Sequence, residues 1–160
     1  MNEDRIVRLS TSPLATWWVR NVASRLDPLI FRASGGRFTS FGPPAMPMLT
    51  LTHKGRRSGR LRSVHLACAL HEGGHLVVAS AMGQEKHPAW RYNLEADPAA
   101  EVQVRDERFA VRAEVLSDAE KEAVWPVLRR AIPQLAVYEK RTERNIRVFR
   151  LRRLTEREGR

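Results

Sequence analysis

The chain has 160 residues, of which 42% are hydrophobic and 29% are charged, a balance typical of one globular domain and not of a disordered or fibrous chain. Its formal net charge of +10 is compatible with an anionic partner such as nucleic acid, phospholipid or a phosphorylated cofactor, but most of the basic residues are arginines, a bias that genome composition also produces, so the charge alone decides nothing. No segment reaches the roughly 18 consecutive apolar residues of a membrane span, and the single cysteine, Cys68, excludes an intramolecular disulfide, so a cytoplasmic protein is expected.

Residues 12–33 predict an amphipathic helix, because apolar residues recur there every three or four positions between arginines. The pair Ser12-Pro13 is typical of a helix start, and the glycines at 35–36 are typical of an end. Pro28 is a candidate interruption of this helix.

The two ends of the chain carry weaker patterns. Residues 1–11 and 155–160 are expected to be flexible. Trp17 and Trp18, next to arginines on the predicted helix, leave open a peripheral contact with the inner face of the cell membrane, although packing against the domain is the commoner outcome for such residues.

The middle of the chain is rich in strand patterns joined by turns. Alternating or continuous apolar runs predict strands at residues 48–52, 60–70, 76–81, 102–104, 109–115 and 147–151. Most neighbouring runs are separated by short turns, which is typical of antiparallel hairpins and not of a doubly wound parallel sheet.

Helices are predicted between these strands. Residues 87–94 form a short one, and Ser117 with Glu120 forms a capping box before a longer one. Another helical turn or two is expected within residues 134–144. The order of elements predicts an α+β fold that is mainly β, with residues 1–160 forming a single domain built on a small antiparallel barrel around which the helices pack.

The segment His71-Glu72-Gly73-Gly74-His75 matches the H-E-x-x-H pattern of zinc proteases. That pattern needs a helix, which two central glycines would destabilise by roughly 2 kcal/mol. The strand patterns on either side favour a hairpin turn, so no metal site is predicted.

The turn at residues 54–62 is glycine-bracketed and basic. Its glycines let backbone amides approach an anion, its serine supplies a hydroxyl, and its arginines supply forked donors suited to phosphate or carboxylate. A solvated loop is the simplest interpretation of such a turn taken alone, and a nucleic-acid contact is the next, although the chain carries no recognised nucleic-acid-binding signature.

Several segments, in order and at matching spacing, resemble the deazaflavin-dependent nitroreductase and quinone reductase family. The residues that carry the resemblance are Gly35-Gly36-Arg37, Leu49 through Gly59 with Arg62, Val77 through Ser80, His87 through Trp90 with Asn93-Leu94 and Asp97-Pro98, Trp125-Pro126, Tyr138 and Arg141 through Arg144 with Val148. The resemblance covers nearly all of the chain after Ser12.

The resemblance implies a split β-barrel and coenzyme F420, a deazaflavin with a phosphate and an oligoglutamate tail. It implies that Arg56, Arg57, Ser58 and Arg62 hold the phosphate and tail. It further implies that the deazaflavin ring is lined by Val78, Ser80, Ala81, Pro88, Trp90 and Asn93. His65 is a candidate cofactor contact or a barrel-filling residue, and Tyr138 is a candidate for orienting the acceptor or relaying a proton.

The activity implied is hydride transfer from reduced F420 to a quinone, nitroaromatic or other activated electrophile, with a small-molecule acceptor and no nucleic acid as partner. Two alternatives stay open, namely a split barrel that binds FMN or another anionic cofactor, and a non-catalytic basic module that binds nucleic acid or lipid. The sequence is compatible with a monomer or a homodimer.

Overall fold

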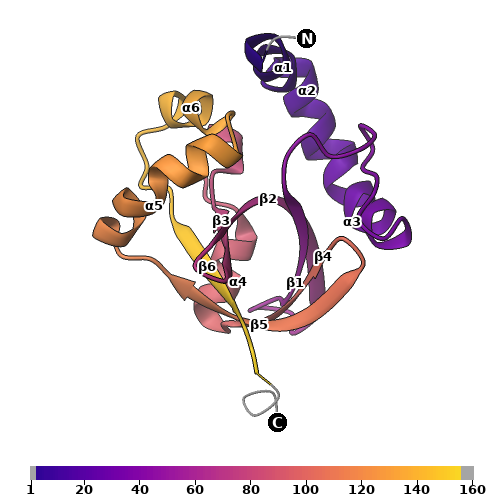
Figure 1. The fold of residues 1–160 in the computed structure, drawn as a ribbon, viewed down its shortest axis with the longest axis vertical. Helices are drawn as coiled ribbons and strands as arrows, with labels where there is room; N and C mark the ends of the chain where they lie inside the picture. The colour runs from indigo at the N-terminus through magenta and orange to yellow at the C-terminus, as the bar shows by residue number, and fades with distance from the viewer. Residues whose placement is uncertain (1–2, 156–160) are drawn as a thin grey trace.

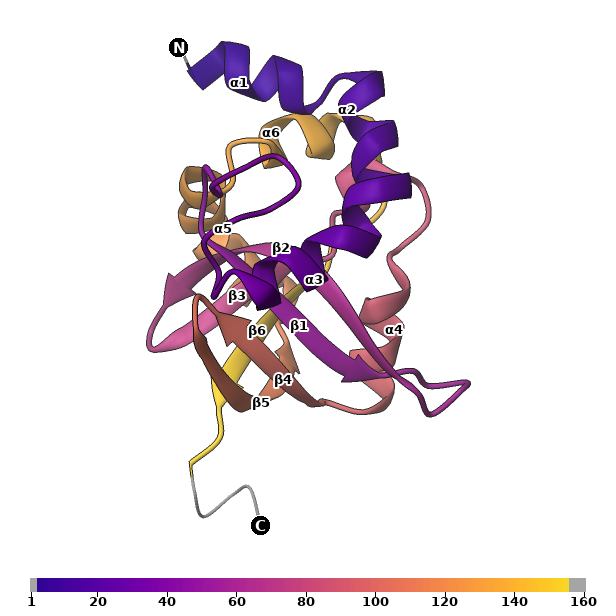
Figure 2. The same cartoon turned by 90° about the vertical axis from the view of Figure 1, so that its right-hand side faces the viewer.

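A computed structural model describes residues 3–155 and contains six antiparallel strands that close into one barrel, in the order β1-β2-β3-β6-β5-β4 (Figures 1 and 2). The strands are β1 (Met48–Lys54), β2 (Leu61–His71), β3 (Gly74–Val78), β4 (Ala99–Val104), β5 (Glu107–Val115) and β6 (Val148–Arg153). β1 pairs with both β2 and β4, which closes the barrel. The barrel architecture expected from the sequence is confirmed, with strand ends displaced by a few residues.

The HEGGH segment forms the tight turn between β2 and β3. Glu72 and Gly73 have φ values of 49° and 73°, and His71 pairs with Gly74 across the turn. Positive φ at both central residues is the geometry of a hairpin turn that follows the twist of the strands. The two histidines of the motif therefore lie on different strands, and the hairpin interpretation is confirmed.

Alternate strand residues point into the barrel and form its core. This interior cluster contains Leu49, Leu51, Cys68, Val77, Ala79, Val102, Val111, Ala113, Phe149 and Leu151. Helix α4 (Ala89–Ala96) adds Trp90 and Leu94 to the same cluster, and the Trp90 ring lies 5.5 Å from that of Phe149. Burial of these side chains fixes α4 against the barrel.

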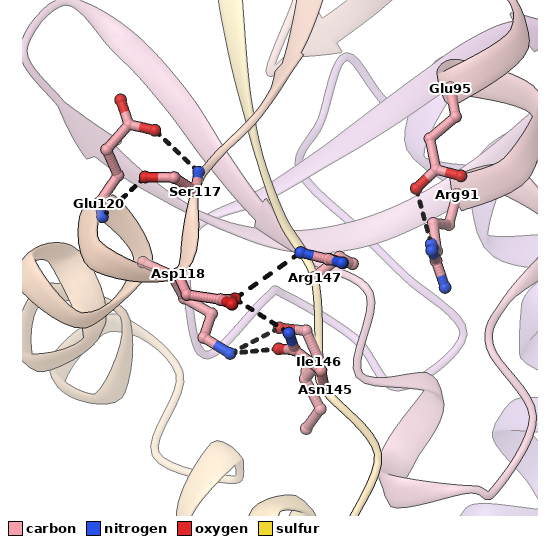
Figure 3. Close-up of polar contacts among 9 residues, drawn as sticks. Arg91, Glu95, Ser117, Asp118, Glu120, Asn145, Ile146 and Arg147 are labelled. Carbon is pink, nitrogen blue, oxygen red and sulfur yellow. Dashed lines mark hydrogen bonds and ion pairs between the residues drawn. The ribbon is translucent and has the colours of Figure 1, made fainter.

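A second apolar cluster lies outside the barrel, under α5 (Asp118–Ala131) and α6 (Leu135–Tyr138). It contains Ala69, Leu76, Val78, Leu116, Val124, Leu128, Ile132, Leu135, Ile146 and Val148. Helix α5 begins at the expected capping box: the Ser117 hydroxyl accepts from the Glu120 amide (3.2 Å), and the Glu120 carboxylate accepts from the Ser117 amide (2.8 Å; Figure 3).

Three helices precede the barrel: α1 (Glu3–Ser10), α2 (Pro13–Trp18) and α3 (Ser24–Ala33). In the view of Figure 1, α3 lies on the opposite side of the barrel from α5 and packs on β2. The end of α1 lies next to α6, where Nε2 of Gln134 donates to the Ser10 hydroxyl (3.4 Å; Figure 2). The cap at Ser12 is confirmed, since its hydroxyl accepts from the Ala15 amide. Pro28 does not interrupt the helix, which runs through α3 after a π-helical turn at Val19–Ala23.

At the N-terminal end of the chain, residues 3–10 form helix α1. The tail expected to be flexible lies almost wholly outside the described residues. Strand β3 ends at Val78, earlier than predicted, so Ser80 and Ala81 lie beyond it, next to or within a 3-10 turn at Ala81–Gly83. No helix in the described part of the chain is long and apolar enough to cross a membrane.

Candidate functional site

The basic turn between β1 and β2 is closed by its own backbone. The Gly55 amide donates to the Arg60 carbonyl (2.8 Å), and the Gly59 amide donates to the Gly55 carbonyl (2.7 Å). Gly59 has a φ of 67°, which favours glycine. A Cβ on Gly55 would lie 2.8 Å from the Ser58 hydroxyl and 3.1 Å from Nε of Arg62, so glycine is what allows these two side chains to come together here.

Asn93 on α4 holds this turn through a side-chain hydrogen bond. Its Oδ1 accepts from the Arg56 amide (3.1 Å), and its Nδ2 lies 3.4 Å from Nδ1 of His53. Because burial lowers the pKa of His53, the imidazole is neutral at pH 7 and its Nδ1 accepts from the Asn93 amide group. Asn93 is only 6% exposed, so its polar groups are used to hold the turn in place.

The turn and α4 line an open cavity of about 450 Å³. Its lining residues are Gly55, Arg56, Arg57, Ser58, Arg62, His87, Ala89, Tyr92 and Asn93. The lining includes three arginines and no acidic residue. The cavity therefore combines forked cationic donors and a hydroxyl, the chemistry that binds phosphate and carboxylate groups.

Three residues of this lining, His87, Ala89 and Tyr92, were not predicted as site residues, although His87 and Ala89 belong to a segment that carries the family resemblance. The spacing of Ala89, Tyr92 and Asn93 is i, i+3 and i+4, so the three share one face of α4. Once Asn93 is assigned to the site, helical periodicity is the signal that identifies the other two.

Tyr92 on α4 contacts two arginine side chains at the site. Its ring lies 5.0 Å from the guanidinium carbon of Arg56 and 4.7 Å from that of Arg91, distances typical of cation–π contacts. Arg91 also pairs with Glu95 at 2.8 Å on the same helix (Figure 3). The aromatic ring thus orders Arg56 at the mouth of the cavity without neutralising its charge.

A second group of predicted residues, Ser80, Ala81 and Tyr138, gathers at the 3-10 turn after β3. A Cβ on Gly83 in this turn would lie 2.7 Å from the Tyr138 carbonyl oxygen, which shows how closely α6 approaches. Burial raises the pKa of Tyr138, so its hydroxyl remains protonated and able to donate at neutral pH. The Arg141 guanidinium lies 5.7 Å from the Tyr138 ring.

The two groups are linked by Arg144. Its Nη1 lies 3.1 Å from Nδ1 of His87 in the cavity wall, and its Nη2 donates to the Ser80 carbonyl. Burial, followed by the charges of Arg91 and Arg144, lowers the pKa of His87, so the neutral imidazole accepts from Arg144.

The remaining predicted residues are not part of the cavity lining. Trp90 is 6% exposed in the barrel core and Val78 is 7% exposed in the cluster under α5, so both side chains belong to the apolar packing and not to the cavity lining. Pro88 is the half-buried N-cap of α4.

His65 is on the outer surface of β2 and does not fill the barrel. Its ring lies 4.5 Å from that of Phe31 on α3, and its Nδ1 lies 3.2 Å from the Thr50 hydroxyl. Burial lowers its pKa to about 4, so the ring is neutral at pH 7. The covering helix, which sequence periodicity could not place, is the reason for this burial.

The described residues contain no cluster of three or more His, Cys, Asp or Glu side chains placed to hold a metal ion. The chemistry that the site can perform by itself is anion binding at the cavity and hydrogen bonding through Tyr138.

Comparison with known proteins identifies a family model that matches residues 18–152, described as F420H(2)-dependent quinone reductase. The F420H(2)-dependent quinone reductase Rv1261c of Mycobacterium tuberculosis (strain ATCC 25618 / H37Rv) is 31% identical over 146 residues, which cover 88% of this chain and 98% of the relative.

Two solved structures have similar sequences and the same fold. One, an F420-H2 dependent reductase (FDR-A), is 35% identical, covers 66% of this chain and 93% of its own, and superposes with a TM-score of 0.61. The other, described as a domain-swapped dimer, is 33% identical, covers 88% of this chain and 99% of its own, and has a TM-score of 0.62.

Proposed function

The chain belongs to the F420H(2)-dependent quinone reductase family and is an F420-dependent oxidoreductase, and on that premise we propose that the cavity between the β1–β2 turn and α4 holds the phosphate and oligoglutamate tail of the coenzyme. The observation that carries this proposal is a cavity lined by Arg56, Arg57 and Arg62 and by no acidic residue. Anions bind where forked cationic donors converge without competing carboxylates.

The donor set fits this part of the coenzyme. The Ser58 hydroxyl accepts from the Arg60 amide (3.3 Å), which leaves its own hydrogen to donate to a phosphate oxygen. Arg56 is ordered by Tyr92, and Arg62 is held beside Gly55 at the floor of the turn. The three guanidiniums would hold the anionic groups and so place the ring end of the coenzyme toward Ser80 and Ala81.

When bound, reduced F420 supplies a hydride, and the quinone that receives it becomes a hydroquinone after taking up a proton. The protein's part in this reaction is orientation and hydrogen bonding. Tyr138, whose hydroxyl stays protonated, would donate to the acceptor oxygen on which negative charge develops. Ser80 and Ala81 would fix the plane of the ring relative to this hydroxyl.

A titration tests the coenzyme assignment. Purified protein is titrated with oxidised F420 and with FMN under identical salt, followed by their fluorescence, and reduced F420 is then mixed with a soluble quinone. We expect saturable micromolar F420 binding and quinone-dependent oxidation. If FMN binds more tightly than F420, the cofactor assigned to this cavity is a flavin. Salt-sensitive binding of DNA, with no binding of either cofactor, would favour a nucleic-acid-binding module.

The helices α2 and α3 present a surface that suggests a second partner. Its exposed apolar side chains are Leu14, Trp17, Trp18, Leu26, Leu29, Phe38 and Phe41, which we call the N-terminal apolar surface. Between residues 13 and 41 the only acidic residue is Asp27, which is buried, whereas several arginines are exposed. We propose that this surface contacts anionic lipid, where a quinone with a long apolar tail would be met.

A homodimer is the second candidate for this surface. A related structure that covers 88% of this chain is described as a domain-swapped dimer. Self-association through the N-terminal apolar surface would bury the same tryptophans as lipid would, so the two proposals are separated by measuring molar mass in solution with and without vesicles.

A further inference from the structure

The segment between β3 and α4 turns through three successive residues in the left-handed region. Ala81, Met82 and Gly83 have φ values of 45°, 56° and 76°, and only glycine adopts this region without steric cost. Two residues with side chains are therefore held in a disfavoured conformation, which persists only where neighbouring groups impose it. Ser80, immediately before the turn, and Ala81 are the residues proposed to lie against the deazaflavin ring.

The Arg144 guanidinium binds both ends of this turn. Its Nη2 donates to the Ser80 carbonyl, its Nε donates to the Gln84 carbonyl (2.7 Å), and its Nη1 donates to the Ala79 carbonyl (3.0 Å). The same Nη1 lies 3.1 Å from Nδ1 of His87, which lines the basic cavity. One side chain therefore joins the segment after β3, the turn and the cavity wall.

Arg141 supports the middle of the turn from the same side. Its Nη1 donates to the Met82 carbonyl (3.3 Å), and its Nη2 donates to the Thr11 carbonyl (2.6 Å). Gly83 is packed so closely that a Cβ there would lie 2.7 Å from the Tyr138 carbonyl oxygen. The turn is thus held between two arginine side chains and the backbone of α6.

The Arg144 guanidinium donates its hydrogen bonds to backbone carbonyls and not to a carboxylate. Among the described residues no acid pairs with it, whereas Arg91, Arg129 and Arg147 each have an acidic partner. A planar guanidinium presents five donors in a fixed arrangement and can satisfy several carbonyls at once, which a lysine ammonium cannot do with the same geometry. The arrangement is that of a side chain that defines backbone shape.

We propose that Arg144 is a positioning residue of the reductase, whose guanidinium holds the 80–87 segment in the conformation that presents Ser80, Ala81 and His87 to the coenzyme. This inference rests on the proposed coenzyme site. Because hydride transfer depends steeply on the distance and angle between donor and acceptor, relaxation of the turn is expected to lower kcat by roughly tenfold to a hundredfold.

The first test needs no coenzyme. Amide hydrogen exchange is compared in wild type, Arg144→Gln and the control Arg147→Gln. Arg147 lies three positions after Arg144 in the chain and forms an ion pair with Asp118 (3.7 Å), so the control removes an equal charge without touching the turn. In the native turn the Gly83 amide donates to the Ser80 carbonyl (2.8 Å) and the Gln84 amide to the Ala81 carbonyl (3.1 Å). We expect faster exchange at these amides in Arg144→Gln alone, with the barrel strands unchanged.

The second test measures function in the same proteins. Arg144→Gln is expected to weaken F420 binding several-fold and to lower kcat as above, while the KM for the quinone changes less than twofold. Arg144→Lys keeps the charge without the planar fork and is expected to fall between wild type and Arg144→Gln. It also serves as the test variant if Arg144→Gln does not fold.

The outcomes separate this inference from the coenzyme assignment. Failure of the wild type to bind F420 overturns the assignment and the catalytic half of the inference, although localised exchange would still establish the clamp on the turn. Unchanged exchange at Gly83 and Gln84, or accelerated exchange spread over the barrel, shows that Arg144 does not hold this turn in particular and overturns the inference.

Discussion

At the scale of single residues, Arg62 tests the proposed coenzyme cavity most directly. It lines the cavity at the floor of the turn, whereas Arg60 in the same turn does not line it. Because a hydrogen bond to a charged group contributes about 1.5 to 3 kcal/mol, Arg62→Ala should weaken F420 binding roughly tenfold to a hundredfold and reduce its salt dependence. Fluorescence titration at two salt concentrations measures both. Arg60→Ala is the matched control, and equal losses in the two variants would remove Arg62 from the site.

Tyr138 should affect turnover and not coenzyme binding. Its protonated hydroxyl is proposed to donate to the acceptor, and substitution by phenylalanine removes that donor while keeping the ring beside Arg141. We expect Tyr138→Phe to lower kcat for a quinone roughly tenfold to a hundredfold, with F420 affinity unchanged within twofold. Stopped-flow oxidation of reduced F420 checks this, and an unaltered rate would show that the acceptor does not use this hydroxyl.

His65 makes stability depend on pH. Its pKa is lowered from 6.5 to about 4 by burial under α3, so between these values the unfolded chain binds more protons than the folded one. The free energy of unfolding is therefore unaffected by the ionisation of His65 above pH 6.5 and falls, by up to roughly 3 kcal/mol, as the pH is lowered toward 4. Urea unfolding of His65→Gln at pH 7 and pH 4.5 should show a smaller difference than wild type.

The control for that experiment is Thr50→Val, which removes the hydroxyl beside the His65 ring and retains the imidazole. This variant should keep the pH dependence of the wild type. If His65→Gln and wild type lose equal stability on acidification, His65 is not the group that titrates.

At the scale of elements, the cap of α5 is the clearest local prediction. Ser117 and Glu120 satisfy each other's backbone amides, and α5 covers the outer apolar cluster. Ser117→Ala should lower the free energy of unfolding by about 1 kcal/mol, whereas Ser117→Gly should cost only a few tenths of this. Urea denaturation measures both, and an unchanged free energy of unfolding in Ser117→Ala would mean that the hydroxyl–amide bond does not stabilise the helix start.

At the scale of the whole molecule, the basic residues behind the net charge of +10 differ in whether an acidic side chain pairs with them. Several arginines are paired with acids across the barrel and helices, for instance Arg152 with Glu114 and Arg153 with Glu107. Such exposed pairs contribute little attraction for a distant anion. The cavity beside α4 is lined by three arginines and no acidic residue. Along the N-terminal apolar surface, the only acidic residue between residues 13 and 41 is the buried Asp27.

The N-terminal apolar surface therefore predicts binding to vesicles. We expect co-sedimentation with vesicles that contain anionic lipid, weakened by salt, and reduced several-fold by the double substitution Leu14→Ser and Trp17→Ser. Leu70→Ser is the control, because Leu70 is 69% exposed on β2 outside this surface. If the double variant still binds vesicles, the lipid contact lies elsewhere on the protein. If the double substitution instead converts a dimer into a monomer and leaves vesicle binding unchanged, the surface is used for self-association.

Local sequence patterns were sufficient where an element depends on neighbours along the chain. The Ser117 capping box, the Gly73 hairpin turn and the β-strand alternation are all short-range effects, and each is present in the structure. The basic turn with Arg56, Arg57, Ser58 and Arg62 could likewise be identified, because the resemblance to known reductases and the chemistry of the turn agree.

What the sequence by itself determined about this protein is its strand and helix content, its barrel class and its basic glycine-bracketed turn, since these follow from periodicity, turn chemistry and charge. Only the tertiary structure decided that Trp90 lies in the barrel core, that α3 covers His65, and that Arg144 reaches back to the turn at Ser80. These contacts join residues far apart in the chain, and packing among whole elements, which no local pattern encodes, selects them.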